Sequence, residues 1–268
     1  MEIHPITGHF GAEIDHVDLT RQLDPESVRA IDQAFTDHKV LVFRDQGAVS
    51  PRALLALAAH FGTPDVEHHP SHPPVDDIPS VKCLTTDGKG FNGTITDSWH
   101  CDGSPRTDTN WTSFLQAIDV PPYGRDTMFA DMEAAYDSLS PKMKALLDGL
   151  TAIHSWGKAR PNEAPVEHPV VHVDPRTGRR SIYVNKVYTR AIKDLRQDES
   201  DAILQFLFQQ THIPEHQLRA SWRPGTIVAW DNQRTQHYIV QDKPYRRIMH
   251  RVMVLRPAAM AETAQRAA

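Results

Sequence analysis

The chain has 268 residues and a formal charge of −5, with a pI near 6.3, a balance that argues against a nucleic-acid-binding surface. No apolar run approaches the roughly 18 residues needed to span a bilayer, so no membrane association is expected. The first residues, Met1 to Pro5, contain neither the basic region nor the apolar region of a secretory signal. Two cysteines do not make a disulfide framework, so a cytoplasmic protein is expected.

The predicted elements begin with short strands between Ile3 and Leu19. Helices are predicted to start at Asp24, Ser50 and Ser140, because each is a capping residue followed by a proline that can occupy the first helical position. Between the first two helices, the continuous apolar run from Val40 to Phe43 predicts a buried strand.

Residues 62–98 are rich in proline, glycine and acidic side chains, and we predict a long active-site loop there with one short strand near Val81. Strands then dominate, around residues 111–117, 127–130, 151–156, 170–173, 181–184, 218–222, 226–230 and 247–255. An amphipathic helix is predicted at 198–210, and residues 257–268 form a tail. Because no repeat or linker is visible, residues 1–268 are predicted to form one domain that is mainly β with flanking helices.

The most informative motif is His100-Cys101-Asp102, which is followed far downstream by His237. In a β-strand, residues i and i+2 point to the same side, so His100 and Asp102 can bind one ion while Cys101 packs as a thiol on the other side. Two histidines and one carboxylate on one face of a metal leave the opposite face open, as in the facial triad of non-haem Fe(II) oxygenases. The third ligand must come from another strand, and residues 246–254 alternate like a strand that pairs back on the one carrying His237.

Several further blocks accompany this motif. The matching stretches are Trp99 to Asp102, Asp126-Thr127, His168 to Val171, Tyr183 to Asn185 and Trp230 to Arg251. Together they make the chain similar, over nearly its whole length, to the taurine/2-oxoglutarate dioxygenase (TauD/TfdA) family. The resemblance implies a double-stranded β-helix, which is a cupin-like jelly roll, with Fe(II) as the metal, 2-oxoglutarate as the co-substrate and O2 as the oxidant.

The resemblance also implies a reaction and its metal ligands. The reaction is hydroxylation of an unactivated C–H bond of a small organic substrate, with succinate and CO2 as co-products. The implied ligands are His100, Asp102 and His237. Related halogenases lack the carboxylate, so the intact Asp102 indicates a hydroxylase. Relatives are commonly dimers or tetramers, and a homo-oligomer is therefore expected.

The implied co-substrate site contains Arg247, whose planar guanidinium would bind a carboxylate of 2-oxoglutarate, and Thr127, which would contact the same carboxylate. Arg251 shares a strand face with Arg247. In the taurine enzyme the matching arginine holds the substrate sulfonate, whereas other members keep an arginine there without using sulfonates. We therefore expect Arg251 to bind either the substrate or 2-oxoglutarate. Arg246, on the opposite face, is expected to be solvated or ion-paired.

The implied substrate pocket departs from the taurine pattern. Its residues are His69, His72, Thr96, Trp156, Tyr188 and Arg251. His72 stands where the taurine enzyme has a tyrosine, and residues 157–167 form a shorter segment than the lid of many relatives. A shorter lid predicts a substrate larger than taurine, such as a natural-product intermediate or an extended organic acid.

Three alternatives stay open. A dioxygenase acting on taurine, an alkylsulfonate or an alkylsulfate would release sulfite or sulfate after the same hydroxylation. A zinc-dependent hydrolase could use the same three ligands, although it does not require the anion site predicted at Arg247 and Thr127. A non-catalytic binding protein on a jelly-roll scaffold would be expected to have lost a metal ligand, and here all three are present.

Overall fold

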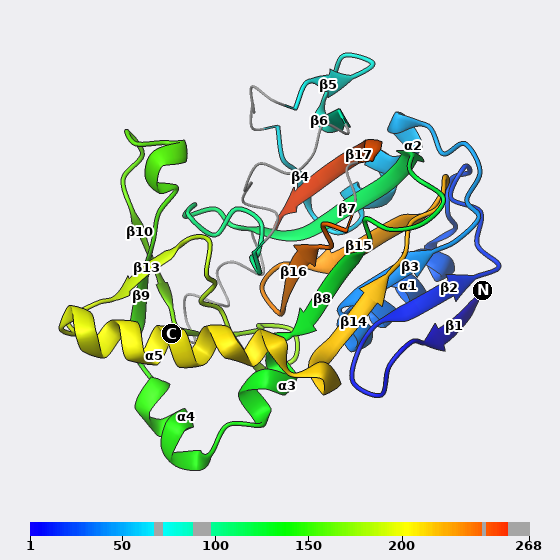
Figure 1. Cartoon of the computed structure of the whole chain (residues 1–268). Helices are drawn as coiled ribbons and strands as arrows, with labels where there is room; N and C mark the ends of the chain where they lie inside the picture. The colour runs from blue at the N-terminus through cyan, green and yellow to red at the C-terminus, as the bar shows by residue number, and fades with distance from the viewer. Residues whose placement is uncertain (67–71, 88–97, 243–244, 257–268) are drawn as a thin grey trace.

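The structure is a computed structural model that describes residues 1–66, 72–87, 98–242 and 245–256 (Figure 1). Within these ranges the larger sheet has nine strands. Their order is β1 (Glu2–Pro5), β2 (Ala12–Asp15), β3 (Val40–Phe43), β15 (Ile227–Asp231), β7 (Asn110–Asp119), β17 (Arg246–Leu255), β6 (Ile78–Asp87) and β5 (Pro74–Val75), with β4 (Thr63–Pro64) paired to β17.

A second sheet has the order β14 (Gln217–Ala220), β8 (Thr127–Asp131) and β16 (Thr235–Ile239). There are two smaller groups of strands, and the three-stranded one lies to one side of these sheets (Figure 1). They are β10 (Val166–Pro169), β9 (Thr151–His154) and β13 (Thr189–Ile192), and the pair β11 (Val171–Val173) and β12 (Arg180–Ile182).

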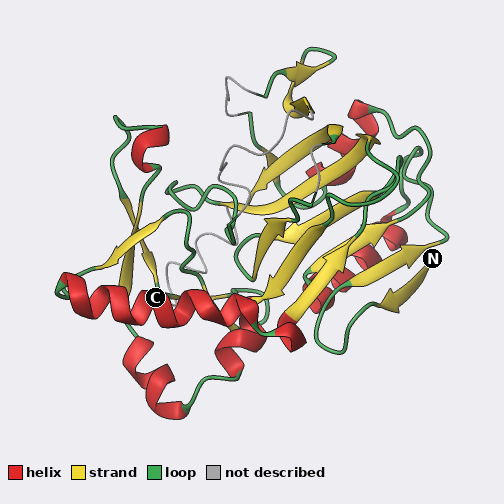
Figure 2. Cartoon of the chain, in the orientation of Figure 1, coloured by secondary structure: helices red, strands yellow, loops and turns green. Residues whose placement is uncertain are grey.

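Helices flank the sheets (Figure 2). They are α1 (Pro25–His38), α2 (Pro51–Ala59), α3 (Met132–Asp137), α4 (Pro141–Leu147) and α5 (Gln197–Gln209), with 3-10 turns η2 (Gly157–Ala159), η3 (Gln210–His212) and η4 (Pro214–His216). No helix in the described ranges is both long enough and apolar enough to cross a membrane.

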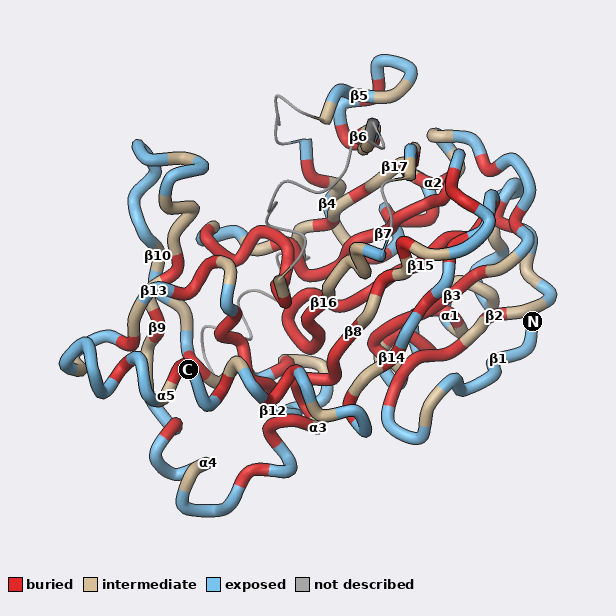
Figure 3. The backbone as a smooth tube through the Cα atoms, in the orientation of Figure 1, coloured by how far each residue is buried: buried red, intermediate tan, exposed pale blue. Residues whose placement is uncertain are grey.

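Side chains alternate between the two faces of β3, and each face packs into a different hydrophobic core. Leu41 and Phe43 belong to the cluster that α1 and α2 cover, whereas Val40 and Val42 join Phe129 of β8 in the cluster between the two sheets. Because both faces of this strand are covered, every position is apolar, and the centre of the molecule is correspondingly buried (Figure 3). Two sheets that face each other across an apolar core confirm the predicted jelly roll with flanking helices.

Many predicted elements are confirmed. Helix α1 begins after Asp24, whose carboxylate accepts two backbone N–H hydrogen bonds from the first turn, and α2 and α4 begin after Ser50 and Ser140, whose hydroxyls each accept one. Strand β3 has the predicted bounds. Helix α3 was not predicted, because its six residues are too few to show a helical period.

The strand expected near Val81, within the loop predicted at residues 62–98, is confirmed but is longer than predicted. Strand β6 occupies ten of these residues and pairs with β17 from Lys82↔Arg251 to Asp87↔Arg246. Most residues of β6 are polar or turn-forming, so the pairing with β17, rather than a local pattern, makes this segment a strand. Residues 67–71 and 88–97, and the predicted tail 257–268, lie outside the described residues.

The partner predicted for β17 is also wrong. Strand β17 pairs with β6 and β7 in the larger sheet, whereas β16, which carries His237, pairs with β8 in the second sheet. Between Ile239 and Arg246 the chain therefore crosses from one sheet to the other. The alternating side chains of residues 246–254 identified the strand correctly. Such a pattern shows only which residues share a face, and it does not indicate which strand is the pairing partner.

His154 of β9 is fully buried and predicts a pH-dependent stability. Its Nδ1 lies 3.1 Å from Ser104 Oγ and its Nε2 lies 3.3 Å from Thr189 Oγ1. Burial, and then the charges of His168 and Arg190, lower the pKa of His154 to about 3. The unfolded chain protonates this histidine near a pKa of about 6.5 and the folded chain does not, so the free energy of unfolding should fall by up to about 1.4 kcal/mol per pH unit below that pKa.

The test is urea unfolding at several pH values. His154→Gln remains uncharged, so its stability should depend less steeply on pH than that of the unaltered protein as the pH falls from about 6 to about 4. His212→Gln removes an exposed histidine and should leave the dependence unchanged. An equal pH dependence in His154→Gln and the unaltered protein would contradict the prediction.

Candidate metal centre and co-substrate site

His100 and His237 are joined through their backbones. The N–H of His100 donates to the carbonyl oxygen of His237 at 3.1 Å, and the N–H of His237 donates back at 2.8 Å. This single antiparallel bridge holds the two imidazole rings with centroids 4.1 Å apart. Asp102 does not continue a strand from His100, as the motif suggested, but lies in the turn that follows. Gly103, at φ +68, allows that turn.

The turn brings the Asp102 carboxylate to the two imidazoles. Its Oδ1 lies 3.9 Å from His100 Nε2 and 3.7 Å from His237 Nε2, and the three ligand atoms all lie within 4.8 Å of one another. Atoms bound about 2.0–2.2 Å from one ion lie at most about 4.4 Å apart. The two measured separations therefore fit a single metal ion, and the structure brings all three predicted ligands together.

Hydrogen bonds orient these ligands. His100 Nδ1 lies 2.8 Å from the carbonyl oxygen of Ser98; a carbonyl only accepts, so Nδ1 carries the proton and Nε2 is free for a metal. Ser113 Oγ donates to Asp102 Oδ2 at 3.1 Å and accepts from Asn232 Nδ2 at 2.9 Å. Sequence reasoning missed Ser113 and Asn232, because only the pairing of β7 with β15 places them behind Asp102.

Ser113→Ala is expected to weaken metal binding by about 10–100-fold, the usual effect of losing a group that orients a ligand. Calorimetric titration with Mn(II) measures this. Ser138→Ala, which removes a hydroxyl bonded only within the end of α3, is the control. If the Mn(II) affinity of Ser113→Ala matches that of the control, the hydrogen bond has no role in holding the ligand.

The electrostatics favour the forms that bind a metal. Burial by itself would raise the pKa of Asp102, but His237, Arg251 and His100 outweigh it and hold the pKa at about 2. Burial, and then His100, lower the pKa of His237 to about 3, and burial also lowers the pKa of His100. At neutral pH the cluster therefore presents an ionised carboxylate and neutral imidazoles.

Thr127 lies beyond the triad along β8, and Arg247 contacts the backbone of Arg125, two residues before Thr127. Thr127 faces Ile239 in the β8–β16 ladder, where His237 faces Phe129, so Thr127 lies two residues, about 7 Å, along the strand from the metal ligand. Arg247 is 4% exposed, and burial, then the charge of Arg125, lower its pKa to about 10. It therefore remains a cation at neutral pH, in an interior where it is not fully solvated.

Arg251 lies at the metal end of the same strand face. Its Nη1 is 4.0 Å from Asp102 Oδ1, and its Nε is buried without a hydrogen-bond partner among the described residues. Arg247 is four residues away along β17, about 14 Å in a strand. The two arginines therefore approach the site from opposite ends, and Arg251 has an N–H available for a further acceptor.

Aromatic rings form a wall that leads away from the triad. The ring of Tyr188 lies 6.5 Å from that of His100, and the ring of Trp156 lies 5.2 Å from that of Tyr188. The guanidinium of Arg160 covers Trp156 at 4.2 Å. The structure thus brings Trp156 and Tyr188 to the metal site and adds Arg160, which the sequence did not indicate.

The other predicted residues are placed as follows. His72 lies two residues before the edge strand β5, and His69 and Thr96 lie outside the described residues. Cys101 is buried, burial raises its pKa to about 12, and Asn185 Nδ2 donates to its sulfur at 3.3 Å, which confirms a packed thiol. Arg246 is exposed and lies 3.7 Å from Asp119, as expected.

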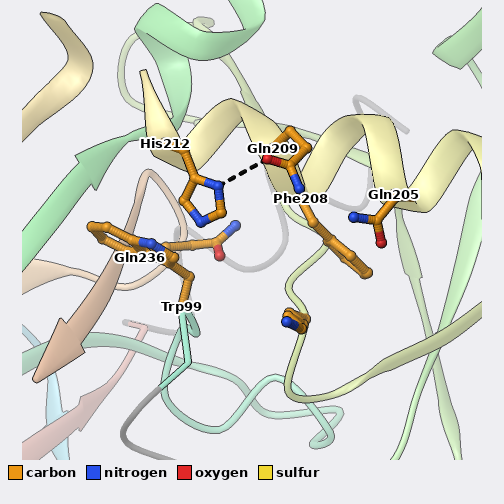
Figure 4. A pocket seen from close by; sticks show the side chains of 7 residues that line it. Trp99, Gln205, Phe208, Gln209, His212 and Gln236 are labelled. Atoms are coloured by element: carbon orange, nitrogen blue, oxygen red, sulfur yellow. Dashed lines mark hydrogen bonds between the residues drawn. The ribbon is translucent and has the colours of Figure 1, made fainter. Parts of the chain in front are cut away.

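A small pocket lies between α5 and Trp99 (Figure 4). Trp99 and Gln236, the neighbours of His100 and His237, line it together with Phe208 of α5. Because adjacent residues of extended chain point to opposite sides, this pocket opens away from the metal ligands. Its volume is about 30 Å³, far below the roughly 300 Å³ of a small-molecule site, so it is not the substrate pocket.

Comparisons with known proteins agree with this geometry. The family model described as "Taurine catabolism dioxygenase TauD, TfdA family" matches residues 2–253. An alpha-ketoglutarate-dependent sulfate ester dioxygenase from Pseudomonas putida is 32% identical over 264 residues, which cover 90% of this chain and 85% of that protein. A pentalenolactone F synthase from Streptomyces arenae is 30% identical over 288 residues, which cover 94% of this chain and 95% of that protein.

The solved structures extend the likeness to the fold. A taurine dioxygenase from Burkholderia xenovorans matches with a TM-score of 0.86 at 32% identity, covering 95% of this chain and 89% of that one. Family model, relatives and fold agree over almost the whole length. The chain therefore belongs to the taurine catabolism dioxygenase TauD, TfdA family and is a 2-oxoglutarate-dependent dioxygenase.

Proposed function

We propose that His100, Asp102 and His237 hold Fe(II), and that the enzyme couples conversion of 2-oxoglutarate to succinate and CO2 with hydroxylation of an unactivated C–H bond in a small organic substrate. The observation that carries the proposal is the convergence of three ligand side chains, with ligand atoms within 4.8 Å of one another. When bound, the iron supplies the activation of O2. The protein supplies the ligands, binds both organic molecules and keeps the site buried.

In this proposal Arg247 and Thr127 bind the far carboxylate of 2-oxoglutarate. Thr127 Oγ1 accepts from Trp222 Nε1 at 3.0 Å, so its own hydroxyl hydrogen can donate to a carboxylate. Only one hydrogen bond engages the guanidinium of Arg247 among the described residues, at 3.1 Å to the carbonyl oxygen of Arg125. Its remaining N–H groups can therefore bind a carboxylate in the two-pronged manner that guanidinium favours.

For the primary substrate, we propose an organic molecule larger than taurine, such as a natural-product intermediate or an organic acid. The short segment after Trp156 and the aromatic wall with Tyr188 support an extended, partly apolar ligand. Arg251 would bind an anionic group either of this substrate or of 2-oxoglutarate. Taurine turnover at an ordinary enzyme rate would instead favour the alternative, a dioxygenase of sulfonates or sulfate esters that releases sulfite or sulfate.

The proposed function is tested by anaerobic titration of the metal-free protein with Fe(II) and 2-oxoglutarate, followed by visible absorbance. A weak band that requires both components would support chelation of 2-oxoglutarate by iron at the triad. Folded protein that binds stoichiometric iron and shows no band would contradict it. The zinc-dependent hydrolase and the non-catalytic binding protein would then become the better explanations of the site.

Assembly and location are further proposals. A homo-oligomer, a dimer or a tetramer, is expected from the behaviour of relatives, and light scattering of the purified protein measures its mass directly. A cytoplasmic location is expected from the sequence and suits a ferrous enzyme, because that compartment is reducing. No partner beyond small molecules is proposed.

A further inference from the structure

Arg125 lies in an unusual turn just before β8. Its φ is +58, and that of Gly124 is +81, in the left-handed region that favours glycine over other residues. Asp242 holds the turn, because its Oδ1 accepts from the N–H of Arg125 at 3.0 Å. A side chain at position 124 would meet Asp242 Oδ2 at 2.7 Å. Arginine therefore occupies position 125 at a conformational cost that glycine would avoid.

The side chain of Arg125 is also costly to bury. The residue is 6% exposed, and its Nε is buried without a hydrogen-bond partner among the residues that the structure describes. Within the described ranges no hydrogen bond or ion pair engages its guanidinium. Burial lowers the pKa of Arg125, and the nearby Asp242 carboxylate offsets this only in part. The position therefore combines an unfavourable backbone conformation with a partly desolvated charge. Neither is explained by packing alone.

Arg125 lies next to the proposed co-substrate residues, and its charge lowers the pKa of Arg247. Arg247 Nη1 donates to the carbonyl oxygen of Arg125 at 3.1 Å, and Thr127 follows two residues later in the chain. In the β8–β16 ladder, Thr127 is already two residues beyond the position opposite His237. Arg125, two residues before Thr127 in the chain, is therefore farther from the metal ligands than Thr127 is. The far carboxylate of a 2-oxoglutarate bound at the triad would lie in the same direction.

We propose that Arg125 is a second cationic binding residue for the far carboxylate of 2-oxoglutarate, acting together with Arg247 and Thr127. This inference rests on the proposed function. Two guanidiniums and one hydroxyl supply more donors than a single carboxylate can accept, so the carboxylate can be fully hydrogen-bonded without water. The bound anion would also supply hydrogen-bond acceptors to the guanidinium of Arg125, while Asp242 keeps the turn in place.

The experiment measures binding of 2-oxoglutarate to the Mn(II)-loaded full-length protein by calorimetry, so that no turnover is needed. Arg125→Gly should weaken binding about tenfold or more, the equivalent of one charge-assisted hydrogen bond. Arg125→Lys, which keeps the charge, should retain most of the affinity. Arg246→Met removes an exposed arginine of β17 and should bind 2-oxoglutarate like the unaltered protein.

Melting temperatures without 2-oxoglutarate separate binding from structural support. Glycine suits φ +58, so the metal-loaded Arg125→Gly protein should melt at the same temperature as the unaltered protein or higher. Unchanged affinity in Arg125→Gly would overturn the inference and leave the proposed function standing. A lower melting temperature in both Arg125 variants, with equal losses of affinity, would also overturn it. If the unaltered protein binds no 2-oxoglutarate, the proposed function fails first and the inference fails with it.

Discussion

Asp102→Ala is expected to abolish turnover while the protein remains folded. The substitution removes the only anionic ligand of the triad and leaves two neutral imidazoles, so the Mn(II) affinity should fall by more than the roughly 10–100-fold that loss of a supporting group costs. The fold should survive, because Ser113 keeps its hydrogen bond to Asn232. Production of succinate from 2-oxoglutarate, Mn(II) calorimetry and circular dichroism measure the three effects.

Asp198→Ala provides the control, since Asp198 is an exposed aspartate of α5 and its loss should change none of the three. An Asp102→Ala protein that turns over at the normal rate would show that the triad has been assigned wrongly. An inactive Asp102→Ala protein that retains its Mn(II) affinity would show instead that this carboxylate acts in catalysis without binding the metal.

Arg247→Met is expected to weaken 2-oxoglutarate binding by about 100-fold or more, because two charge-assisted hydrogen bonds are lost. Without the co-substrate, the free energy of unfolding should stay the same or rise, because methionine replaces a buried cation with an apolar side chain of similar length. Activity should recover in part at high 2-oxoglutarate concentration. Titration of the Mn(II)-loaded protein with 2-oxoglutarate measures the loss of affinity, and urea unfolding measures the free energy of unfolding.

Arg246→Met is the matched control, since it removes the same charge from the adjacent residue of the same strand, where the side chain is exposed. It should change neither binding nor stability by a measurable amount. If Arg247→Met binds 2-oxoglutarate as tightly as the control, the carboxylate is held elsewhere. Arg251, whose Nη1 lies 4.0 Å from Asp102 Oδ1 and whose Nε has no hydrogen-bond partner among the described residues, would then be the first candidate.

Local sequence signals predicted much of the fold. Asp24 and Ser50 marked helix starts because capping depends on the first turn alone. The run Val40 to Phe43 marked a strand because burial on both faces requires apolar residues throughout. The three candidate metal ligands came from the His100-Cys101-Asp102 motif together with the resemblance to the dioxygenase family, because a His-x-Asp pair alone is a weak signal.

Other features depend on contacts between distant segments. The strand expected near Val81 is longer than predicted, because pairing with β17 organises all ten residues of β6. Strand β17 was assigned the wrong partner because alternation does not specify pairing. Ser113 and Asn232 could not be predicted to support Asp102, since neither has a local signal for that role. Arg125 is a further case, because its positive φ, its burial and its proximity to Arg247 are all properties of the folded chain.

The position of β17 has a consequence for how the protein folds during synthesis. This strand is made after the other described strands, yet it lies inside the larger sheet between β7 and β6. Until it emerges from the ribosome, β7 and β6 lack their shared neighbour and present unpaired edges, which are prone to aggregation. Because β17 also carries Arg247 and Arg251, the nascent chain should gain its anion-binding residues at the step that removes these edges.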